Sequence, residues 1–81
     1  MYYTYAISSQ TRNYIYVGLT ADITRRLSEH NSGKNKTTKP YLPFILIYLE
    51  EHETRIEARE REKYFKSGIG REKLRKIRDA M

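Results

Sequence analysis

The segment from Tyr14 to Gly33, YIYVGLTADITRRLSEHNSG, constrains the fold more than any other part of this chain. Its first seven residues place apolar side chains at every second position, which predicts a β-strand. Asp22 then provides a typical helix N-cap, and residues 31–33, Asn-Ser-Gly, form a typical helix end. The segment therefore predicts a strand, a short turn and one helix.

The predicted helix places two polar side chains on the face that must bury apolar surface. Ile23 and Leu27 are its apolar positions, and at about 100° per residue Arg26 and His30 fall on the same stripe. The ordinary interpretation is an arginine at the rim of the core with its charged end in water. The alternative is a functional site, which the preceding strand favours.

The preceding strand carries a tyrosine and a glycine on one face. Ile15 and Val17 point to the opposite face, which we expect to be the core, whereas Tyr16 and Gly18 share the other. A glycine in a strand permits close approach to the backbone. The strand can therefore bring a phenol hydroxyl to the polar stripe of the helix, although tyrosines also stabilise sheets simply by pairing across strands.

The rest of the chain supplies two more strands and two more helices. Apolar alternation, turn residues and a capping box give the following expectation: strands at 2–8 and 44–49, a hairpin loop at 9–13, a loop at 34–43, a helix from Thr54 to about Lys66, and a basic helix at 71–81. We expect both faces of the strand at 44–49 to be largely covered. The chain is expected to form one domain, residues 1–81.

Glu62 is the one carboxylate of the second predicted helix that we expect on its core face. Ala58, Phe65 and Ile69 line one stripe at 100° intervals, and Glu62 falls within that stripe. A carboxylate that is at least half buried needs a partner, a proton or a metal ion. An arginine from another part of the chain is the ordinary partner.

The charge balance favours a polyanionic partner. The formal net charge is +6 on 81 residues, and 8 tyrosines are available for stacking or for hydrogen bonds to phosphate. In the predicted loop at 34–43, cations and hydroxyls suited to phosphate contacts come from Lys34, Lys36 and Lys39 together with Thr37 and Thr38. A solvated surface loop explains the same residues equally well.

Several classes of site are excluded by composition. The chain has no cysteine, so it forms neither disulfides nor thiolate metal sites, and its 2 histidines cannot make a structural zinc site. Neither a signal peptide nor an apolar run of membrane-spanning length is present, so we expect a soluble, cytoplasmic protein that does not associate with membranes.

Five separated parts of the sequence together closely resemble the pattern of the GIY-YIG nuclease superfamily: Tyr3-Thr4-Tyr5, Tyr16-Val17-Gly18, Arg26, His30 and Glu62. The chain looks most like the short stand-alone members related to the nuclease domain of the bacterial excision-repair endonuclease. The resemblance runs from Tyr2 to about Ile77. It implies an α+β fold, with the order β-β-α-β-α-α around a small three-stranded antiparallel sheet.

The resemblance also implies a DNA endonuclease that uses one divalent metal ion, Mg²⁺ or Mn²⁺. Position by position, Tyr16 matches the tyrosine we assign as general base, and Tyr5 the one that orients the water or shares its proton. Arg26 matches the catalytic arginine, whose fork suits the developing phosphate charge. His30 matches an auxiliary residue and Glu62 the sole protein ligand of the metal, which suits a largely hydrated Mg²⁺. We expect Gly18 to contact the nucleic acid, together with Lys34, Lys36 and Lys39.

Two departures from the family pattern keep other functions open. The first triplet lacks its glycine, and no asparagine follows Glu62, where several members supply one. A catalytically weak or inactive basic nucleic-acid-binding module is therefore the first alternative, and a protein-interaction domain the second. The sequence selects no DNA target and no oligomeric state, so a partner protein that supplies target choice is compatible with it. The excision-repair likeness favours a role in DNA repair.

Overall fold

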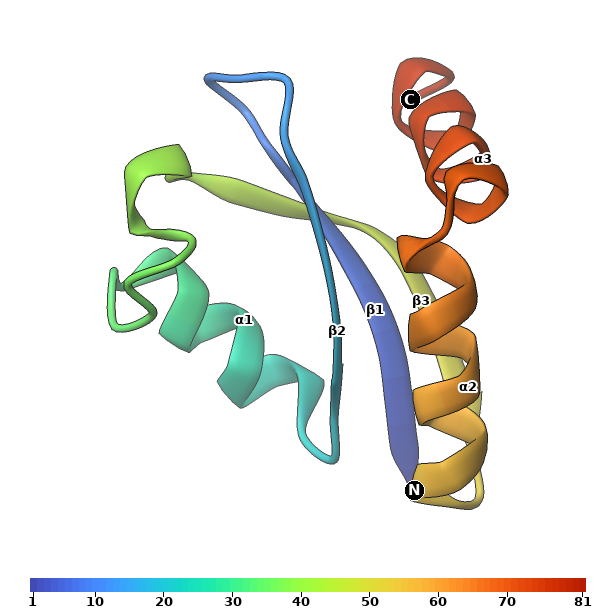
Figure 1. Ribbon diagram of the computed structural model, residues 1–81. Helices are drawn as coiled ribbons and strands as arrows, with labels where there is room; N and C mark the ends of the chain where they lie inside the picture. The colour runs from blue at the N-terminus through green and yellow to red at the C-terminus, as the bar shows by residue number, and fades with distance from the viewer.

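Three antiparallel strands form the centre of the molecule in the order β2-β1-β3 (Figure 1). The computed structural model describes residues 1–81, with strands β1 (Tyr2–Ser9), β2 (Ile15–Thr20) and β3 (Phe44–His52). Three α-helices accompany them: α1 (Ile23–Asn31), α2 (Arg55–Lys66) and α3 (Gly68–Asp79), with a 3₁₀ turn, η1 (Lys39–Tyr41), before β3. The α+β class and the order β-β-α-β-α-α are therefore confirmed.

The register of the hairpin places the first tyrosine triplet beside the second. Tyr5 of the central strand β1 lies opposite Gly18 of β2, and Ile7 lies opposite Tyr16. Strand β2 pairs only with β1 and so forms one edge of the sheet. Tyr5 and Tyr16 consequently share one face of the sheet near its free edge.

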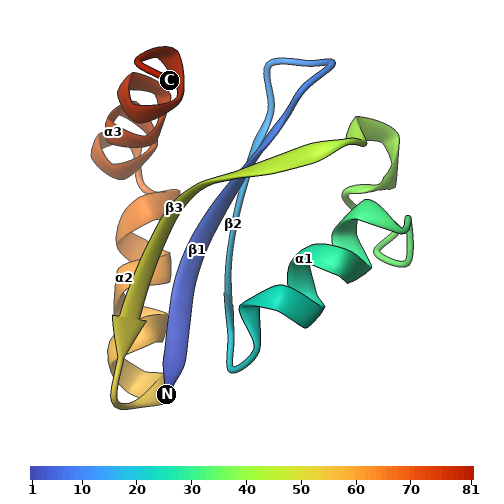
Figure 2. The same ribbon diagram turned by 180° about the vertical axis from the view of Figure 1, so that it is seen from behind.

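Both faces of the sheet are buried, whereas the pattern of β2 suggested a core on one face only. Helices α2 and α3 lie on one side and α1 on the other (Figures 1 and 2). The first core contains Ala6, Ile15, Val17, Ile47, Phe65 and Leu74. The second contains Tyr5, Ile7 and Phe44, with Ile23 and Leu27 packed against it. Tyrosine rings can form this second core because they bury carbon surface while their hydroxyls find polar partners.

Helix boundaries follow the capping residues. The Asp22 side chain accepts a hydrogen bond from the backbone N–H of Arg25, and the chain leaves α1 through Gly33 at φ 79°. Helix α2 starts with the predicted Thr54–Glu57 capping box. These expectations are confirmed.

Two boundary predictions are wrong. Helix α3 begins at Gly68 rather than at 71, because Ser67 adopts an extended conformation that both ends α2 and caps α3. Ile69 therefore does not continue the buried stripe of α2 and is 73% exposed. Strand β3 runs on to His52, and Leu49 is 44% exposed, so its far end is less covered than expected. None of the helices has the length and hydrophobicity needed to cross a lipid bilayer.

Candidate active site

Tyr5 is the centre of the candidate site, and its position depends on Gly18. Only 1% of the Tyr5 surface is exposed, and its ring lies across the Gly18 backbone of the neighbouring strand. A Cβ at position 18 would lie 2.6 Å from the Tyr5 hydroxyl oxygen and 2.8 Å from its Cζ. The close approach that a glycine permits is therefore made by Tyr5 of the same chain, and this side of Gly18 is not open to a ligand.

Helix α1 delivers two polar side chains to the Tyr5 hydroxyl. The oxygen lies 2.9 Å from His30 Nε2 and accepts a 3.4 Å hydrogen bond from Arg26 Nε. His30 is completely buried, and Arg26 keeps about a third of its side chain exposed. The stripe that the sequence placed on the apolar face of α1 is therefore a hydrogen-bonded cluster between β1 and α1.

A directed chain of hydrogen bonds follows from counting donors. Arg26 can only donate, so Tyr5 accepts from it and has its own O–H left for His30 Nε2. His30 Nδ1 lies 3.0 Å from Thr38 Oγ1, and the Thr38 hydroxyl donates to the Asn35 carbonyl at 3.4 Å. We assign the Nδ1–H tautomer to His30 because every group in the chain then has a partner.

Thr38 has a different position from the one expected. The sequence suggested that its hydroxyl could contact phosphate, yet Thr38 is completely buried and faces His30. It immediately precedes η1, whose 3₁₀ turn carries it inward beneath the end of α1. The loop composition gave no signal for this role, because a buried and an exposed threonine look alike in a polar loop.

The protonation states in this cluster follow from burial and from one charge. Burial raises the pKa of Tyr5 to about 12, outweighing the hydrogen bond from Arg26. The pKa of Arg26 is raised, first by its hydrogen bond to Tyr5, and burial together with the Arg26 charge lowers the pKa of His30. At neutral pH the phenol is therefore protonated, the imidazole is neutral and the guanidinium carries the positive charge.

Tyr16 is the more accessible of the two site tyrosines. Its half-buried ring lies 4.9 Å from the His30 ring and 6.4 Å from the Tyr5 ring, between centroids. Tyr16 also contributes to the raised pKa of Arg26. Tyr16 therefore belongs to the same cluster and, unlike Tyr5, can be reached from solvent.

Glu29 is a neighbour of the site that sequence reasoning described only in part. It pairs with Arg25, four residues earlier, at 3.4 Å, and accepts a second hydrogen bond from Arg26 Nη1, three residues earlier, at 3.2 Å. Both spacings place side chains side by side on a helix, so helix periodicity could have indicated both contacts. Glu29 thus holds one side of the Arg26 guanidinium, while Tyr5 holds its Nε.

Glu62 lies on α2, on the opposite side of the sheet from α1 (Figures 1 and 2), and no hydrogen bond joins it to the cluster around Tyr5. Its side chain is 18% exposed and lies on the buried stripe between Ala58 and Phe65, as the helix periodicity indicated. Its partner is Lys66, at 3.2 Å, rather than an arginine from elsewhere. The Glu62 charge contributes to the raised pKa of Tyr5, so the carboxylate acts electrostatically on the tyrosine cluster.

Glu62 by itself could hold only a weakly coordinated hard cation. No group of three or more His, Cys, Asp or Glu side chains converges in this chain. A metal ion here would take one carboxylate oxygen from Glu62 and its other ligands from water and substrate, as Mg²⁺ commonly does. The three loop lysines Lys34, Lys36 and Lys39 are exposed and follow the end of α1.

Comparisons with known proteins agree with the fold. A family model described as the GIY-YIG catalytic domain matches residues 1–75. A UPF0213 protein of Staphylococcus haemolyticus is 33% identical over 79 residues, which cover 96% of this chain and 95% of the relative. A UPF0213 protein of Streptococcus sanguinis is 38% identical over 66 residues, covering 80% and 76%. The solution NMR structure of a UPF0213 protein from Bacillus halodurans aligns with a TM-score of 0.56 and 31% identity, over 95% of this chain and 85% of that chain.

Proposed function

The chain belongs to the GIY-YIG nuclease family, and on this premise we propose that it is a metal-dependent endonuclease that hydrolyses phosphodiester bonds in DNA. The match over residues 1–75 confirms the resemblance drawn from the tyrosine triplets and the three polar residues. The family implies a nucleic-acid substrate. The choice of DNA, the metal and the residue roles are our proposal.

One observation carries the proposal: the buried Tyr5 hydroxyl holds both Arg26 and His30 beside the accessible Tyr16. A cluster built only for stability would not need a guanidinium with a third of its side chain in solvent. Such an arginine, fixed through its Nε and one terminal nitrogen, is preorganised to donate from its remaining N–H groups to a phosphate that gains charge.

The roles of the two tyrosines differ because their burial differs. Tyr16 acts as the general base that takes a proton from the attacking water, since it reaches solvent and lies beside the positive charge of Arg26. Tyr5, with a pKa of about 12, stays protonated and orients the cluster. His30 acts as the neutral acceptor that fixes the Tyr5 hydroxyl.

Glu62 would hold one Mg²⁺ or Mn²⁺ ion, with water completing the coordination. When bound, such an ion polarises the phosphate and stabilises the leaving oxygen. The exposed lysines Lys34, Lys36 and Lys39 would contact neighbouring phosphates as point charges. Target choice would come from the structure of the DNA or from a partner protein.

The test is cleavage of supercoiled plasmid with Mg²⁺, with Mn²⁺ and with a chelator. We expect nicked or linear product only with metal, and we expect Glu62→Gln to remove it. Glu60→Gln removes the same charge from an exposed position on the same helix and should leave cleavage within about threefold, like other surface changes.

Arg26→Ala should lower cleavage by about 10²- to 10³-fold, the usual effect of removing one donor to a developing negative charge. Arg25→Ala, the exposed neighbour in the same helix, is its control. Cleavage by Glu62→Gln and Arg26→Ala at the wild-type rate, with both variants folded by circular dichroism, contradicts the proposal.

A nucleic-acid-binding module without turnover is the second candidate. The absence of any asparagine after Glu62 favours it, because several family members supply an amide to the site there. The observation that distinguishes it is a salt-sensitive gel shift of duplex DNA without any metal-dependent product.

A further inference from the structure

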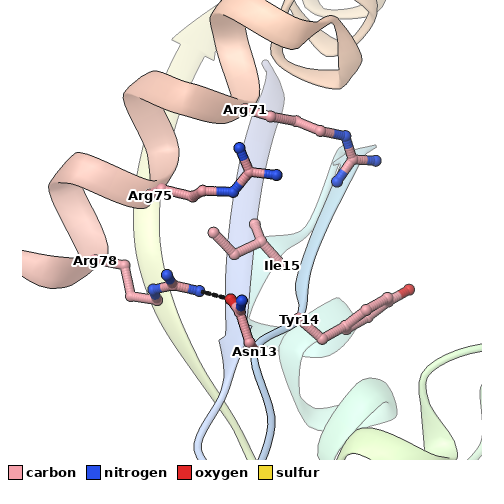
Figure 3. Close-up of a pocket in the computed structure, with 6 residues that line it drawn as sticks. All are labelled: Asn13, Tyr14, Ile15, Arg71, Arg75 and Arg78. Atoms are coloured by element: carbon pink, nitrogen blue, oxygen red, sulfur yellow. Dashed lines mark hydrogen bonds between the residues drawn. The ribbon is translucent and has the colours of Figure 1, made fainter.

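A hollow of about 110 Å³ lies between α3 and the start of β2 (Figure 3). Arg71, Arg75 and Arg78 line it from α3, and Asn13, Tyr14 and Ile15 line it from the hairpin. The spacing of the three arginines, i, i+4 and i+7, puts them on one face of the helix. Figure 3 shows their side chains reaching from α3 toward the hairpin. No acidic side chain lines this hollow, which we call the arginine pocket.

Two of the three arginines are fixed by groups that leave donors free. Arg71 Nε donates to the Lys66 carbonyl at 3.3 Å, and Arg71 forms no salt bridge, so both terminal nitrogens are free to bind an anion. Arg78 donates from Nη1 to Asn13 Oδ1 at 2.6 Å and from Nε to Asp79 at 3.0 Å, which leaves Nη2. Arg78 is only 22% exposed, although Asp79 is largely in solvent.

Arg75 completes the pocket between the other two (Figure 3). Its one carboxylate contact is Glu72 at 3.2 Å, and both side chains of that pair are about half exposed, so water screens the attraction. Three guanidinium groups that face one space repel one another unless an anion lies among them. The arrangement therefore favours a bound anion over an empty pocket.

Phosphate is the anion that this geometry fits best. Arginine presents a planar fork of N–H donors that matches phosphate oxygens in pairs. The volume of about 110 Å³ is enough for one tetrahedral oxyanion. The pocket consequently suits a single phosphate presented on a chain.

The position of the arginine pocket on β2 connects it with the candidate active site. The pocket contacts Ile15, whereas the Tyr5 ring crosses β2 at Gly18, three residues further along the same edge strand. Side chains alternate along a strand, so Ile15 faces the side of the sheet that α3 covers, and the Tyr5 ring at Gly18 faces the side that α1 covers. DNA that lies across the β2 edge would therefore contact both places.

We propose that the arginine pocket binds a backbone phosphate of the DNA outside the candidate active site. The proposal rests on the proposed function in its choice of DNA. The pocket would set the register of the strand while leaving the chemistry to Tyr16 and Arg26. It is a positioning site that acts through phosphate charge, so it would not read base sequence.

Metal-free binding of a fluorescent duplex, measured by anisotropy at several salt concentrations, tests the pocket without requiring turnover. The variant is Arg71→Gln with Arg75→Gln. Its matched control is Arg59→Gln with Lys63→Gln, two exposed cations of α2 that form no ion pair and lie outside the pocket. Both variants lose two positive charges, and circular dichroism checks that both are folded.

We expect the pocket variant to bind DNA at least about tenfold more weakly, which is the cost of losing one charged hydrogen bond. Its affinity should also depend less steeply on salt concentration, by the equivalent of one to two phosphate contacts. The control should lose less than about threefold. Equal losses in both variants, or no loss in the pocket variant, overturn the proposal, because then only the overall charge matters.

A duplex short enough to hold the protein in one register, with single methylphosphonate linkages, locates the phosphate. Neutralising the phosphate that occupies the pocket should weaken wild-type binding but leave binding by the pocket variant unchanged. If no linkage shows this dependence, the proposal is overturned. Plasmid cleavage decides the separate question of turnover: a protein that fails to cut DNA but passes both binding tests retains the arginine pocket and loses the proposed nuclease function.

Discussion

Replacing Gly18 by alanine tests whether the Tyr5 ring position is what the site depends on. The added Cβ would lie 2.8 Å from Tyr5 Cζ, whereas carbon atoms pack at about 3.5 Å or more. The ring must therefore shift by about 0.7 Å. That shift either lengthens the 2.9 Å bond to His30 to about 3.6 Å, beyond hydrogen-bonding distance, or pushes the phenol into the imidazole.

The magnitude follows from two opposing terms. Overpacking a buried site costs about 1–3 kcal/mol, and replacing a strand glycine returns about 0.5–1 kcal/mol of backbone entropy. We therefore expect Gly18→Ala to lower the free energy of unfolding by about 1–2 kcal/mol in urea titration. A misplacement approaching 1 Å at a reacting group can cost about 10²-fold in rate, so plasmid cleavage should fall by roughly that factor.

Gly68→Ala is the matched control, because no atom lies within 4 Å of the Cβ it would add. Its free energy of unfolding should stay the same or rise by up to about 1 kcal/mol, since alanine is the better helix former. A double-mutant cycle with Tyr5→Phe adds a second check, because removing the hydroxyl removes the 2.6 Å contact. If Gly18→Ala and Gly68→Ala have equal stability and equal cleavage, the steric reasoning is refuted.

Three further predictions concern polar groups in the fold. The pKa of His30 in the folded chain is lowered, chiefly by burial, so the unfolded chain binds a proton at His30 more readily. The free energy of unfolding should therefore fall by up to ~1.4 kcal/mol per pH unit below about pH 6.5, and His30→Gln should flatten this dependence in urea titrations. Burial raises the pKa of Glu50, but hydrogen bonds outweigh it, chiefly the one from Arg61 at 2.8 Å, and the pKa is lowered; Glu50→Gln should therefore cost about 1 kcal/mol at pH 7, and this cost should shrink as the pH falls below about 4.3 and vanish once the pH is below the lowered folded pKa. Thr38→Val leaves the His30 Nδ1–H without an acceptor and should cost about 1–3 kcal/mol in thermal or urea unfolding, against less than about 0.5 kcal/mol for Thr37→Val at the exposed neighbour.

Local patterns predicted the parts of the fold that depend on neighbouring residues. The caps at Asp22 and Thr54 act within one helical turn, and the stripe that joins Arg26 to His30 requires only the helix period. Ser67 shows the limit of this reasoning. A serine between two helical stretches can interrupt a helix or lie within it, and the difference displaced Ile69 from the core to solvent.

The candidate site was only partly predictable because its contacts join residues that are far apart in sequence. The two hydrogen bonds of the Tyr5 hydroxyl span 21 and 25 residues, and no sequence period relates their ends. The resemblance to a nuclease family supplied the list of residues, but not the reason for the glycine, which is to make room for the Tyr5 ring. It also did not indicate Thr38, whose burial depends on the turn that follows α1.

The arginine pocket extends the same argument to the surface. The sequence identified α3 as a basic helix, and helix periodicity alone puts Arg71, Arg75 and Arg78 on one face. What turns a charged face into a pocket is the hairpin that lies against it, where Asn13 accepts from Arg78 across 65 residues. Overall charge gives weak, salt-sensitive binding along any DNA, whereas a cation fixed at a set distance from the active site selects one register of the strand. If the pocket works as proposed, the phosphate that it holds determines where the DNA is cut. Replacing the pocket arginines should then make the position of cleavage less uniform before cleavage is lost.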